Sequence, residues 1–562
     1  MKRTFSFQHL LLLLSLAGVL FFVGLGSMGL TDRDEGRNAE AGREMYETGD
    51  WISPTFNYEL RVAKPVFLYW LMSLSYCLFG VNEFAARFPS AFFGIALILL
   101  QYLFLARVRD PLVALFAGLM LLLNGEILVL GRMALTDSVL IFFVTLSLCG
   151  FWLGLWGEGR ARHWIWVFYA SMALATLTKG PIGVILPLLT AALYLTFSRR
   201  WSEYWRRGFP LAGTLVFIML ALPWYVAMLA IHGEAYSTGA QAHTIGRFLH
   251  PMEEHGGTIF FYIPILFLGF FPWSGFLPVA LYQTFKNVRR SMFDVETSNR
   301  ELRTSNLELE FFAALWVVSV FLFFTLTATR LPHYIGPLFP GAAILTASYW
   351  HRALAEPTTP GIRASIHTLT GLGYMLAFAL AALPSLYSTF TEKIAKEFPA
   401  AAQVDLGGGP YAAALVLMVG MAMVSYFGLA ESRRAGVFWA AGATIALVAL
   451  IAIQITLPRL NRYLIAPPQE LAYAAGMNLG PGDRFILYGS TRPSSVFYAK
   501  RKAIDIPAGE EERIRPYLTQ PGRTMILLPA RLRPQLPAEA VGFPVILERY
   551  GYLLLANEPM IK

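Results

Sequence analysis

The chain has 562 residues, of which 56% are hydrophobic and 14% are charged, and its mean hydropathy is +0.52. Soluble domains usually carry about 25% charged residues, so this composition indicates a polytopic membrane protein with little room for large soluble domains. The net charge of +9 is expected to lie mostly in cytoplasmic loops and does not indicate nucleic-acid binding. The two cysteines, Cys77 and Cys149, lie in apolar stretches and predict neither a disulfide framework nor a thiolate metal site.

The N-terminus starts with basic residues and continues into a long apolar run, 8–29. Signal peptides have an apolar run of roughly 7–15 residues, which is shorter, and no small-residue cleavage site follows here. We therefore expect an uncleaved first transmembrane helix with its N-terminus in the cytoplasm.

Thirteen apolar runs are long enough to cross a membrane, which takes about 20 residues. They are 8–29, 85–106, 111–129, 137–156, 163–178, 181–197, 209–230, 259–283, 311–328, 334–350, 366–386, 411–430 and 437–456. Segment 65–80 is shorter and begins with proline. If 65–80 does not cross, the arginine-rich loops fall on the side of the N-terminus, as the positive-inside rule requires. We expect it to be an interfacial helix, and a short spanning helix is the alternative.

This arrangement places a second set of loops together on the outer face. They are 30–64, 130–136, 179–180, 231–258, 329–333, 387–410 and all residues after 457. Pro458 is expected to break the last transmembrane helix. Short apolar runs at 484–489, 524–529, 544–550 and 552–557, separated by Gly and Pro, then predict a small α/β domain. The predicted fold is an all-α membrane domain (1–457) followed by an outer α/β domain (458–562).

Carboxylates on two outer loops are the first candidates for chemistry. Asp34 and Glu35 directly follow the first helix. On a helix Arg37 would neighbour Asp34 and Glu40 at i,i+3, so an interfacial helix with self-paired charges is one interpretation. Acidic residues contribute little to topology, which favours a functional role for Asp34 or Glu35. Asp137 begins a predicted helix, where it could cap the helix or share a site with Asp34.

Cations form a second group at outer helix ends, against the charge bias of that face. They are Lys64, Lys179, Arg247 and Arg330. Each could reach lipid phosphates by snorkelling. Together they would suit a phosphate or diphosphate, because converging cations stabilise a phosphate leaving group.

A metal site is a weaker candidate. His243 with a carboxylate could bind a divalent metal, although its spacing matches no common ligand pattern. His333 and Tyr334 lie close to Arg330 in the sequence. No G-x-G-x-x-G motif follows a strand and there is no P-loop, so a lipid phosphate that carries a group for transfer suits these residues better than a nucleotide.

Several motifs, taken in order and spacing, carry a family resemblance. They are DRDEGRNAEAGREMYETGDW (32–51), RVAKPVFLYW (61–70), ARFPSAFFG (86–94), GRMALTDS (131–138), LTKGP (177–181), IGRF (245–248), FFPWS (270–274) and RLPHYIGPLFP (330–340). The sequence resembles the GT-C class of polyprenyl-phosphate-dependent glycosyltransferases. Within that class it is similar to the aminoarabinose (4-amino-4-deoxy-L-arabinose) lipid A transferases, which are related to protein O-mannosyltransferases. The resemblance implies about thirteen helices, interfacial helices in a first periplasmic loop (31–84) and a periplasmic C-terminal domain.

The resemblance also implies roles for particular residues. Asp34 and Asp137 correspond to the catalytic pair. The residues implied in phosphate binding are Arg37, Lys64 and Arg247, with Lys179 and Arg330 as further matches. Glu35, His333 and Tyr334 are expected to bind substrate, and His243 is a candidate metal ligand. The family's Glu-Lys-Pro motif here reads Ala63-Lys64-Pro65, and Ala63 has no ligand atom, so the use of Zn or Mg stays open.

The function implied is that of an inverting glycosyltransferase in a bacterial inner membrane. It would move aminoarabinose or a related sugar from an undecaprenyl-phosphate carrier to lipid A or another acceptor on the periplasmic face. One alternative is an O-mannosyltransferase-like enzyme with a protein acceptor. Another is a transporter or flippase of lipid-linked sugar, although transporters usually have repeated halves and polar residues at mid-membrane depth.

Overall fold

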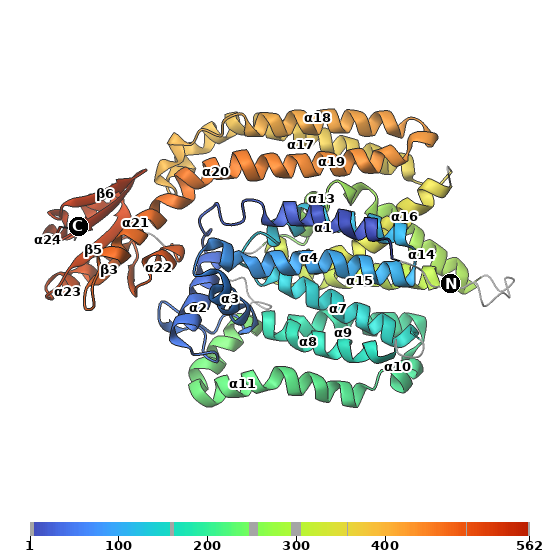
Figure 1. Cartoon of the computed structure of the whole chain (residues 1–562), viewed down its shortest axis with the longest axis horizontal. Helices are drawn as coiled ribbons and strands as arrows, with labels where there is room; N and C mark the ends of the chain where they lie inside the picture. Colours follow the sequence, from blue (N-terminus) through green and yellow to red (C-terminus); the bar gives the residue numbers. More distant parts are fainter. Residues whose placement is uncertain are drawn as a thin grey trace.

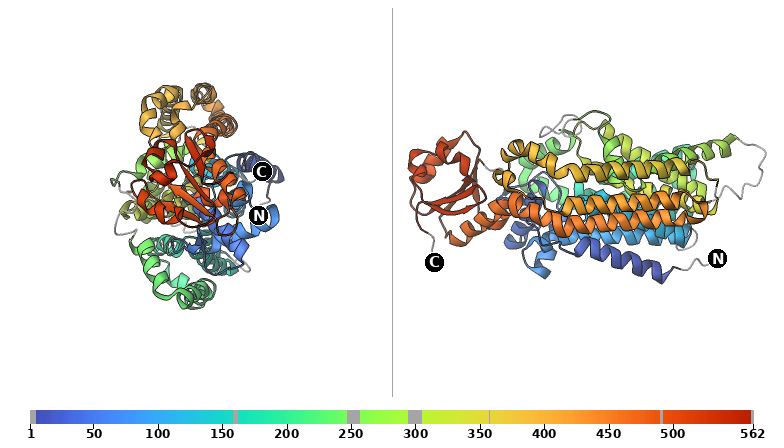
Figure 2. Two further views of the ribbon diagram at one scale, coloured as in Figure 1. Left: turned by 90° about the vertical axis from the view of Figure 1, so that its left-hand side faces the viewer. Right: turned by 90° about the horizontal axis from the view of Figure 1, so that it is seen from above.

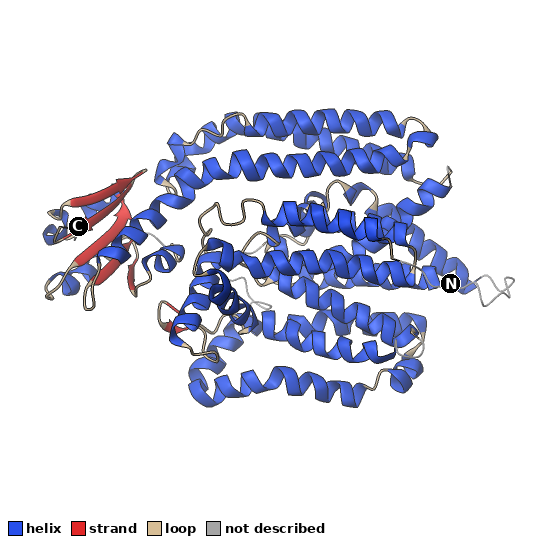
Figure 3. Ribbon diagram, in the orientation of Figure 1, coloured by secondary structure: helices blue, strands red, loops and turns tan. Residues whose placement is uncertain are grey.

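The computed structural model describes residues 5–157, 162–246, 257–293, 305–356, 358–489 and 492–559. It is a bundle of long helices that run side by side, with a small sheet at one end (Figure 1, Figure 3). The N-terminus lies at the opposite end of the bundle from the sheet (Figure 1).

Apolar helices make up the bundle. They are α1 (Phe7–Phe22), α4 (Glu83–Val108), α5 (Pro111–Leu122), α6 (Gly125–Leu130), α7 (Asp137–Trp156), α8 (Trp164–Lys179), α9 (Ile182–Ser198), α11 (Pro210–Gln241), α13 (Tyr262–Gly269), α14 (Leu277–Phe293), α15 (Ser305–Leu326), α16 (Phe339–Ala355), α17 (Ile362–Ala395), α18 (Gly409–Gly428) and α19 (Ala435–Ile451). A short helix, α10 (Trp201–Arg207), links α9 to α11.

Seven helices in the described part of the chain are long and apolar enough to cross a membrane. There are eight if α13 and the segment after it, which are bent by 119° to each other, form one broken crossing. The chain is thus a mostly helical, multi-pass membrane protein, as the composition predicts. Each predicted apolar run overlaps one or two of these helices, although the run 8–29 extends seven residues past the end of α1. The finer count of thirteen crossings stays a prediction.

Short polar side chains begin several of these helices. The side chain of Asn82 accepts a hydrogen bond from Ala85 N at 2.9 Å at the start of α4, and Asp110 and Asn124 cap α5 and α6 in the same way. Each satisfies an amide that the first turn of a helix leaves without a partner. These caps determine where the chain turns back into the bundle.

Two helices of the first loop lie at the end of the bundle that carries the sheet (Figure 1). They are α2 (Asp34–Thr48) and α3 (Phe67–Phe79), and a small hairpin of β1 (Thr55–Phe56) and β2 (Glu59–Leu60) separates them. α3 has 13 residues and is about 20 Å long, whereas the hydrocarbon core of a bilayer is about 30 Å thick. This length agrees with the interfacial helix predicted for 65–80.

α17, α18 and α19 pack on one another and form a layer on one side of the bundle. Viewed end-on, α11 lies on the opposite side (Figure 2). Helix α19 leads directly toward the sheet, so this layer connects the membrane bundle to the C-terminal residues (Figure 1).

The expectation that Pro458 breaks the last transmembrane helix is wrong. The helix is continuous from Ala435 to Asn478, through α20 (Leu457–Leu460) and α21 (Ala466–Asn478). Two π-helical turns, at 452–456 and 461–465, flank the proline. A π-turn widens the helix locally, so the ring of Pro458 is accommodated where a regular α-helix would clash with it.

The C-terminal residues form a five-stranded mixed sheet in the order β4-β3-β5-β7-β6. Its strands are β3 (Arg484–Tyr488), β4 (Ala503–Ile506), β5 (Thr524–Pro529), β6 (Val545–Arg549) and β7 (Tyr552–Ala556). β3 pairs in parallel with β4 and β5, and β7 pairs antiparallel with β5 and β6. Short helices α22 (Ser494–Ala499), α23 (Arg515–Leu518) and α24 (Ala538–Val541) connect the strands. β4 was not predicted from the sequence, because it is only four residues long and contains Asp505. The proposed boundary at 458 stays a prediction.

Candidate active site

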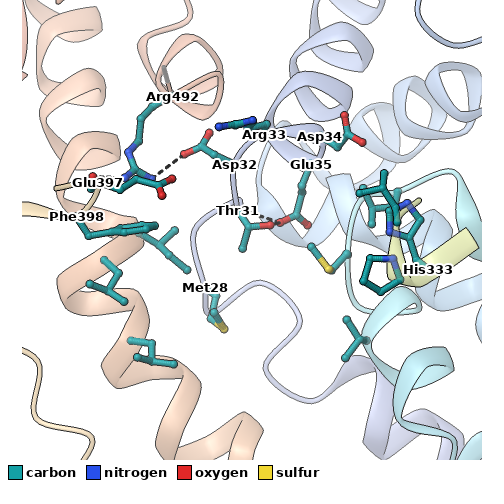
Figure 4. A pocket seen from close by; sticks show the side chains of 18 of the residues that line it. Met28, Thr31, Asp32, Arg33, Asp34, Glu35, His333, Glu397, Phe398 and Arg492 are labelled. Atoms are coloured by element: carbon teal, nitrogen blue, oxygen red, sulfur yellow. Dashed lines mark hydrogen bonds and ion pairs between the residues drawn. The ribbon is translucent and has the colours of Figure 1, made fainter. Parts of the chain in front are cut away.

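A cavity of about 1430 Å³ lies between the first loop, the end of α17 and the C-terminal sheet (Figure 4). Among the residues singled out from the sequence, five line it: Asp34, Glu35, Arg37, His333 and Tyr334. Segments 129–135, 265–268 and 457–465 contribute an apolar lining. The cavity therefore combines charged residues with a surface suited to hydrocarbon.

Glu35 holds the first loop in place. Its side chain is fully buried and pairs with Arg87 of α4 at 2.7 Å. It also accepts hydrogen bonds from Thr31 N at 2.7 Å and from Ala134 N at 2.8 Å. Arg87 in turn donates to the carbonyls of three residues in the loop that follows α1: Leu25, Met28 and Gly29. One buried pair thus joins the start of α2 to the loop that precedes Asp137.

Asp34, the neighbour of Glu35, points to the other side of the helix start. Its Oδ2 lies 3.2 Å from the ammonium nitrogen of Lys64, and its side chain is 41% exposed, whereas that of Lys64 is 9% exposed. The Lys64 ammonium holds the pKa of Asp34 well below its usual range, with help from Arg61. Asp34 is therefore an ionised carboxylate at the cavity wall.

Asp137 and Lys179 form a second ion pair between α7 and α8. The distance from Lys179 Nζ to Asp137 Oδ1 is 2.6 Å, and both side chains are largely buried. Lys179 also lies 4.8 Å from the centre of the Tyr334 ring. Asp137 is the first residue of α7, but its carboxylate forms an ion pair with Lys179. Helix capping alone therefore does not explain this aspartate.

The two ion pairs lie within electrostatic reach of the same histidine. Burial, opposed by Asp137 and Asp34 and reinforced by Lys179 and Lys64, lowers the pKa of His333 to about 4. His333 is thus neutral near pH 7 and can donate or accept a hydrogen bond. Residues from four distant segments of the chain meet here.

The remaining candidates are less central. Arg37 is half-buried, lines the cavity and forms no ion pair with a described residue. Arg330 donates hydrogen bonds to the carbonyls of Gly257 and Thr325 and does not line the cavity. Arg247 lies outside the described residues. The self-paired charges considered for α2 do not form as expected, because Asp34 pairs with Lys64 and Glu40 pairs with Arg43 at 2.6 Å.

The described residues do not fit a divalent metal. No group of three His, Cys, Asp or Glu side chains among them could hold an ion. Ala63 offers no ligand, and His243 lies half-buried in a π-helical turn, Ala242–Gly246. A stable site needs more protein ligands than one, so no step of the chemistry is assigned to a metal here.

Three arginines of the site were not predicted from the sequence. Arg87 lies inside a predicted spanning run, and a charge at such a position is itself a signal of function. Arg61 donates to Asn38 Oδ1 at 3.2 Å and to Tyr69 OH at 2.9 Å beside Asp34. Arg492, in the C-terminal region, pairs with Asp32 at 3.5 Å across the cavity edge (Figure 4). No sequence pattern indicated this last pair.

Comparisons with known proteins bear on the family of the chain. The family described as dolichyl-phosphate-mannose-protein mannosyltransferase matches residues 31–237. The undecaprenyl phosphate-alpha-4-amino-4-deoxy-L-arabinose arabinosyl transferase of Pseudomonas aeruginosa (strain UCBPP-PA14) is 32% identical over 378 residues, which cover 67% of this chain and 65% of that protein. The enzyme of the same description from Edwardsiella ictaluri (strain 93-146) is 32% identical over 65% of this chain and 63% of its own length. The chain is related to the aminoarabinose transferases. The matched region thus spans slightly less than two thirds of these relatives.

The solved structures extend the likeness to the whole fold. The crystal structure of ArnT from Cupriavidus metallidurans bound to undecaprenyl phosphate superposes with a TM-score of 0.77 at 22% identity and covers 98% of both chains. The Archaeoglobus fulgidus oligosaccharyltransferase in the apo form has a TM-score of 0.51 at 12% identity over 94% of this chain and 70% of its own. The predicted resemblance to GT-C proteins is confirmed, and this relative of the aminoarabinose transferases has their fold.

The Glu35–Arg87 pair predicts a large effect on stability. Glu35→Gln leaves the buried Arg87 without its counter-charge, and such a loss costs about 3–5 kcal/mol. Thermal unfolding in detergent measures it as a clear drop in melting temperature. Glu59→Gln is the control, because Glu59 and its partner Lys502 are 74% and 59% exposed and such pairs contribute about 1 kcal/mol at most. Equal melting temperatures for the two variants would contradict the assignment.

The pKa of His333 predicts a pH dependence of stability. Its folded value, about 4, lies below the unfolded value of about 6.5, so the folded state binds fewer protons. The neutral ring therefore adds to the free energy of unfolding above about pH 6.5. This contribution is lost as the pH falls toward 4, at up to about 1.4 kcal/mol per pH unit. His333→Gln should reduce this loss in melting temperature between pH 7 and pH 4. If the melting temperature of His333→Gln falls with pH as steeply as that of wild type, the assignment of the low pKa to His333 is wrong.

Proposed function

We propose that this chain is an inverting glycosyltransferase of a bacterial inner membrane. It transfers aminoarabinose or a related sugar from an undecaprenyl-phosphate carrier to lipid A, at the periplasmic end of its helix bundle. The observation that carries the proposal is Asp34, an ionised carboxylate held by Lys64 at the wall of a cavity that is partly apolar. The names of the related enzymes support the donor and the reaction type.

The location of the site supports a lipid-linked donor. The first-loop helices and the C-terminal sheet lie at one end of the bundle, opposite the N-terminus (Figure 1). This is the end that the distribution of arginines assigns to the outer face. A carrier lipid can place its phosphate there while its chain stays among apolar helices. Thirteen crossings and a periplasmic C-terminal domain (458–562) belong to this proposal.

The two lysines provide the charge that a phosphate leaving group needs. Lys64 and Lys179 lie directly behind the cavity lining, Lys64 against Asp34 and Lys179 against Tyr334. Without substrate they are held by Asp34 and Asp137. A bound phosphate carries the same sign of charge as these carboxylates and competes with them for the ammonium groups. As the bond between the anomeric carbon and the phosphate oxygen breaks, the lysines stabilise the charge that develops on that oxygen. Arg37 at the cavity wall adds to this role.

The acceptor attacks the anomeric carbon on the face opposite the phosphate, which inverts the configuration. Its oxygen forms the new glycosidic bond, and the carrier leaves as undecaprenyl phosphate. Asp34 is a weak base because Lys64 lowers its pKa, and it therefore suits positioning better than proton removal. A phosphate acceptor is already ionised and loses no proton, so this geometry favours an acceptor such as the phosphate of lipid A.

A protein acceptor is the second candidate. The family that matches residues 31–237 is described as a protein mannosyltransferase family, and its match includes both Asp34 and Asp137. A serine or threonine hydroxyl must lose a proton during transfer, so it needs a stronger base than the ion-paired Asp34 provides.

Removal of the Asp34 charge tests the proposal. Asp34→Asn keeps the size of the side chain, and we expect transfer to fall by at least about 100-fold. The assay follows radiolabelled sugar from undecaprenyl phosphate in vesicles that contain lipid A. Glu59→Gln, another first-loop acid, should keep full activity. Full transfer by Asp34→Asn would exclude the role of Asp34. Label on protein would identify the second candidate, and label moved across the bilayer without transfer would identify a flippase.

The ligand set predicts resistance to chelators. Because Ala63 provides no metal ligand and the described residues form no cluster, transfer in EDTA should stay within about twofold of the untreated rate. Loss of activity in EDTA that Zn²⁺ or Mg²⁺ restores would show that a metal does take part.

A further inference from the structure

The cavity carries positive charge that its own acids do not neutralise. Six basic residues line it: Arg33, Arg37, Lys393, Lys396, Arg492 and Arg531. Of the five acids in the lining, Asp32, Asp34 and Glu35 are held by Arg492, Lys64 and Arg87. Two acids, Glu126 and Glu397, remain in the lining. Five of its basic residues remain as well, because only Arg492 among the six is used in these pairs. Within the described residues, the cavity is therefore short of negative charge.

Three of these cations gather on one wall. Lys393 and Lys396 lie at the end of α17, and Arg531 follows β5. The Arg531 guanidinium donates to the Lys396 carbonyl at 2.7 Å, so the sheet and the helix end are in contact. We call Lys393, Lys396 and Arg531 the far wall, because Glu397, the neighbour of Lys396, lies across the cavity from Asp34 (Figure 4).

Arg492 stabilises the backbone behind the far wall. It donates to the Glu397 carbonyl at 3.0 Å and lies 4.4 Å from the centre of the Phe398 ring. Figure 4 shows Arg492, Glu397 and Phe398 on one side of the cavity, with Asp34 and His333 on the other. The far wall thus adjoins a stretch of backbone whose carbonyls accept hydrogen bonds from Arg492 and Arg531.

The far-wall lysines lack partners that would explain them. Both are exposed, and neither ammonium group forms an ion pair or hydrogen bond with a described residue. Lys64 and Lys179 differ, because each is paired with an aspartate and neither lines the cavity. Like charges held near one another repel, and a bound anion relieves that repulsion.

The rest of the lining indicates what kind of anion binds. Apolar side chains line the same cavity: Val129, Leu130, Ile265, Leu268, Leu457, Leu460, Leu464 and Ile465. A soluble anion would gain nothing from them, whereas the chains of a lipid bury apolar surface there. Charge and apolar lining together therefore suit a lipid with an anionic head group.

We infer that the far wall binds a phosphate group of the acceptor lipid, across the cavity from Asp34. This rests on the proposed function and adds a second anion site to it, distinct from the Lys64 and Lys179 pair. The site holds the acceptor by its phosphate while the reacting end of the lipid lies toward Asp34. Glu397 beside Lys396 limits the attraction, so its charge opposes binding.

Binding to the purified full chain tests the inference without any transfer step. The chain is placed in nanodiscs of phosphatidylcholine, and the binding of fluorescent lipid A is compared with that of the same lipid after removal of its phosphates. In Lys393→Ala/Lys396→Ala we expect lipid A to bind about tenfold more weakly and the dephosphorylated lipid to bind within about twofold of wild type. Neither ammonium group makes a structural contact, so the melting temperature should not change.

Two variants serve as matched controls. Glu397→Gln removes an acid next to Lys396 but keeps the carbonyl that Arg492 binds, and it should bind lipid A about two- to threefold more tightly. Lys500→Ala removes an exposed lysine that does not line the cavity and should bind like wild type. Equal losses for both lipids in the double variant, or no loss, would overturn the inference.

Two further binding measurements, and a comparison of binding with sugar transfer, distinguish failure of this inference from failure of the proposed function. Displacement of lipid A by millimolar inorganic phosphate would identify a soluble anion as the ligand and overturn the lipid assignment. Undecaprenyl phosphate should bind equally well to wild type and the double variant. If wild type binds lipid A through the far wall but transfers no sugar to it, the proposed function fails and this site stands. If transfer proceeds and the double variant keeps the wild-type KM for lipid A, this inference fails alone.

Discussion

The buried pair of Glu35 and Arg87 is the constraint on which the site depends. It joins the loop after α1, the start of α2, helix α4 and the loop before α7 through contacts of 2.7–2.9 Å. A buried ion pair is costly to leave incomplete, so each partner requires the other. With Glu35 held in this way, the adjacent Asp34 has to face Lys64 and the cavity.

Charge pairing also explains how acids and lysines persist beside apolar helices. Asp34 and Asp137 each neutralise one lysine, which avoids isolated charges in a poorly solvated site. In the proposed function, the lysines of these pairs exchange a carboxylate for the phosphate of the donor. The far-wall lysines have no such partners among the described residues. The charges of Lys64 and Lys179 are therefore neutralised before substrate binds, whereas those of the far wall are not.

Much of the fold could be predicted from the chain. Hydrophobic runs located the helices, the charge bias placed Asp34 and the C-terminal sheet at one end, and α3 lies at that same end, as expected of an interfacial helix (Figure 1). Less of the site could be predicted from the sequence. Asp34, Lys64, Asp137 and Lys179 could be named as candidates, but their pairing could not, because partners 30 and 42 positions apart leave no periodic signal. The same holds for Arg492 and Asp32, which come from opposite ends of the chain.

By itself the sequence determined the membrane class, the position of the apolar helices and which end of the bundle carries the polar loops. Those properties follow from burial and charge, which act residue by residue and leave a pattern in the chain. Only the tertiary structure decided which carboxylate meets which lysine, that the helix continues through Pro458, and that α17 and the C-terminal sheet close the cavity. These depend on contacts between distant segments, whose distances and angles arise only when the helices pack.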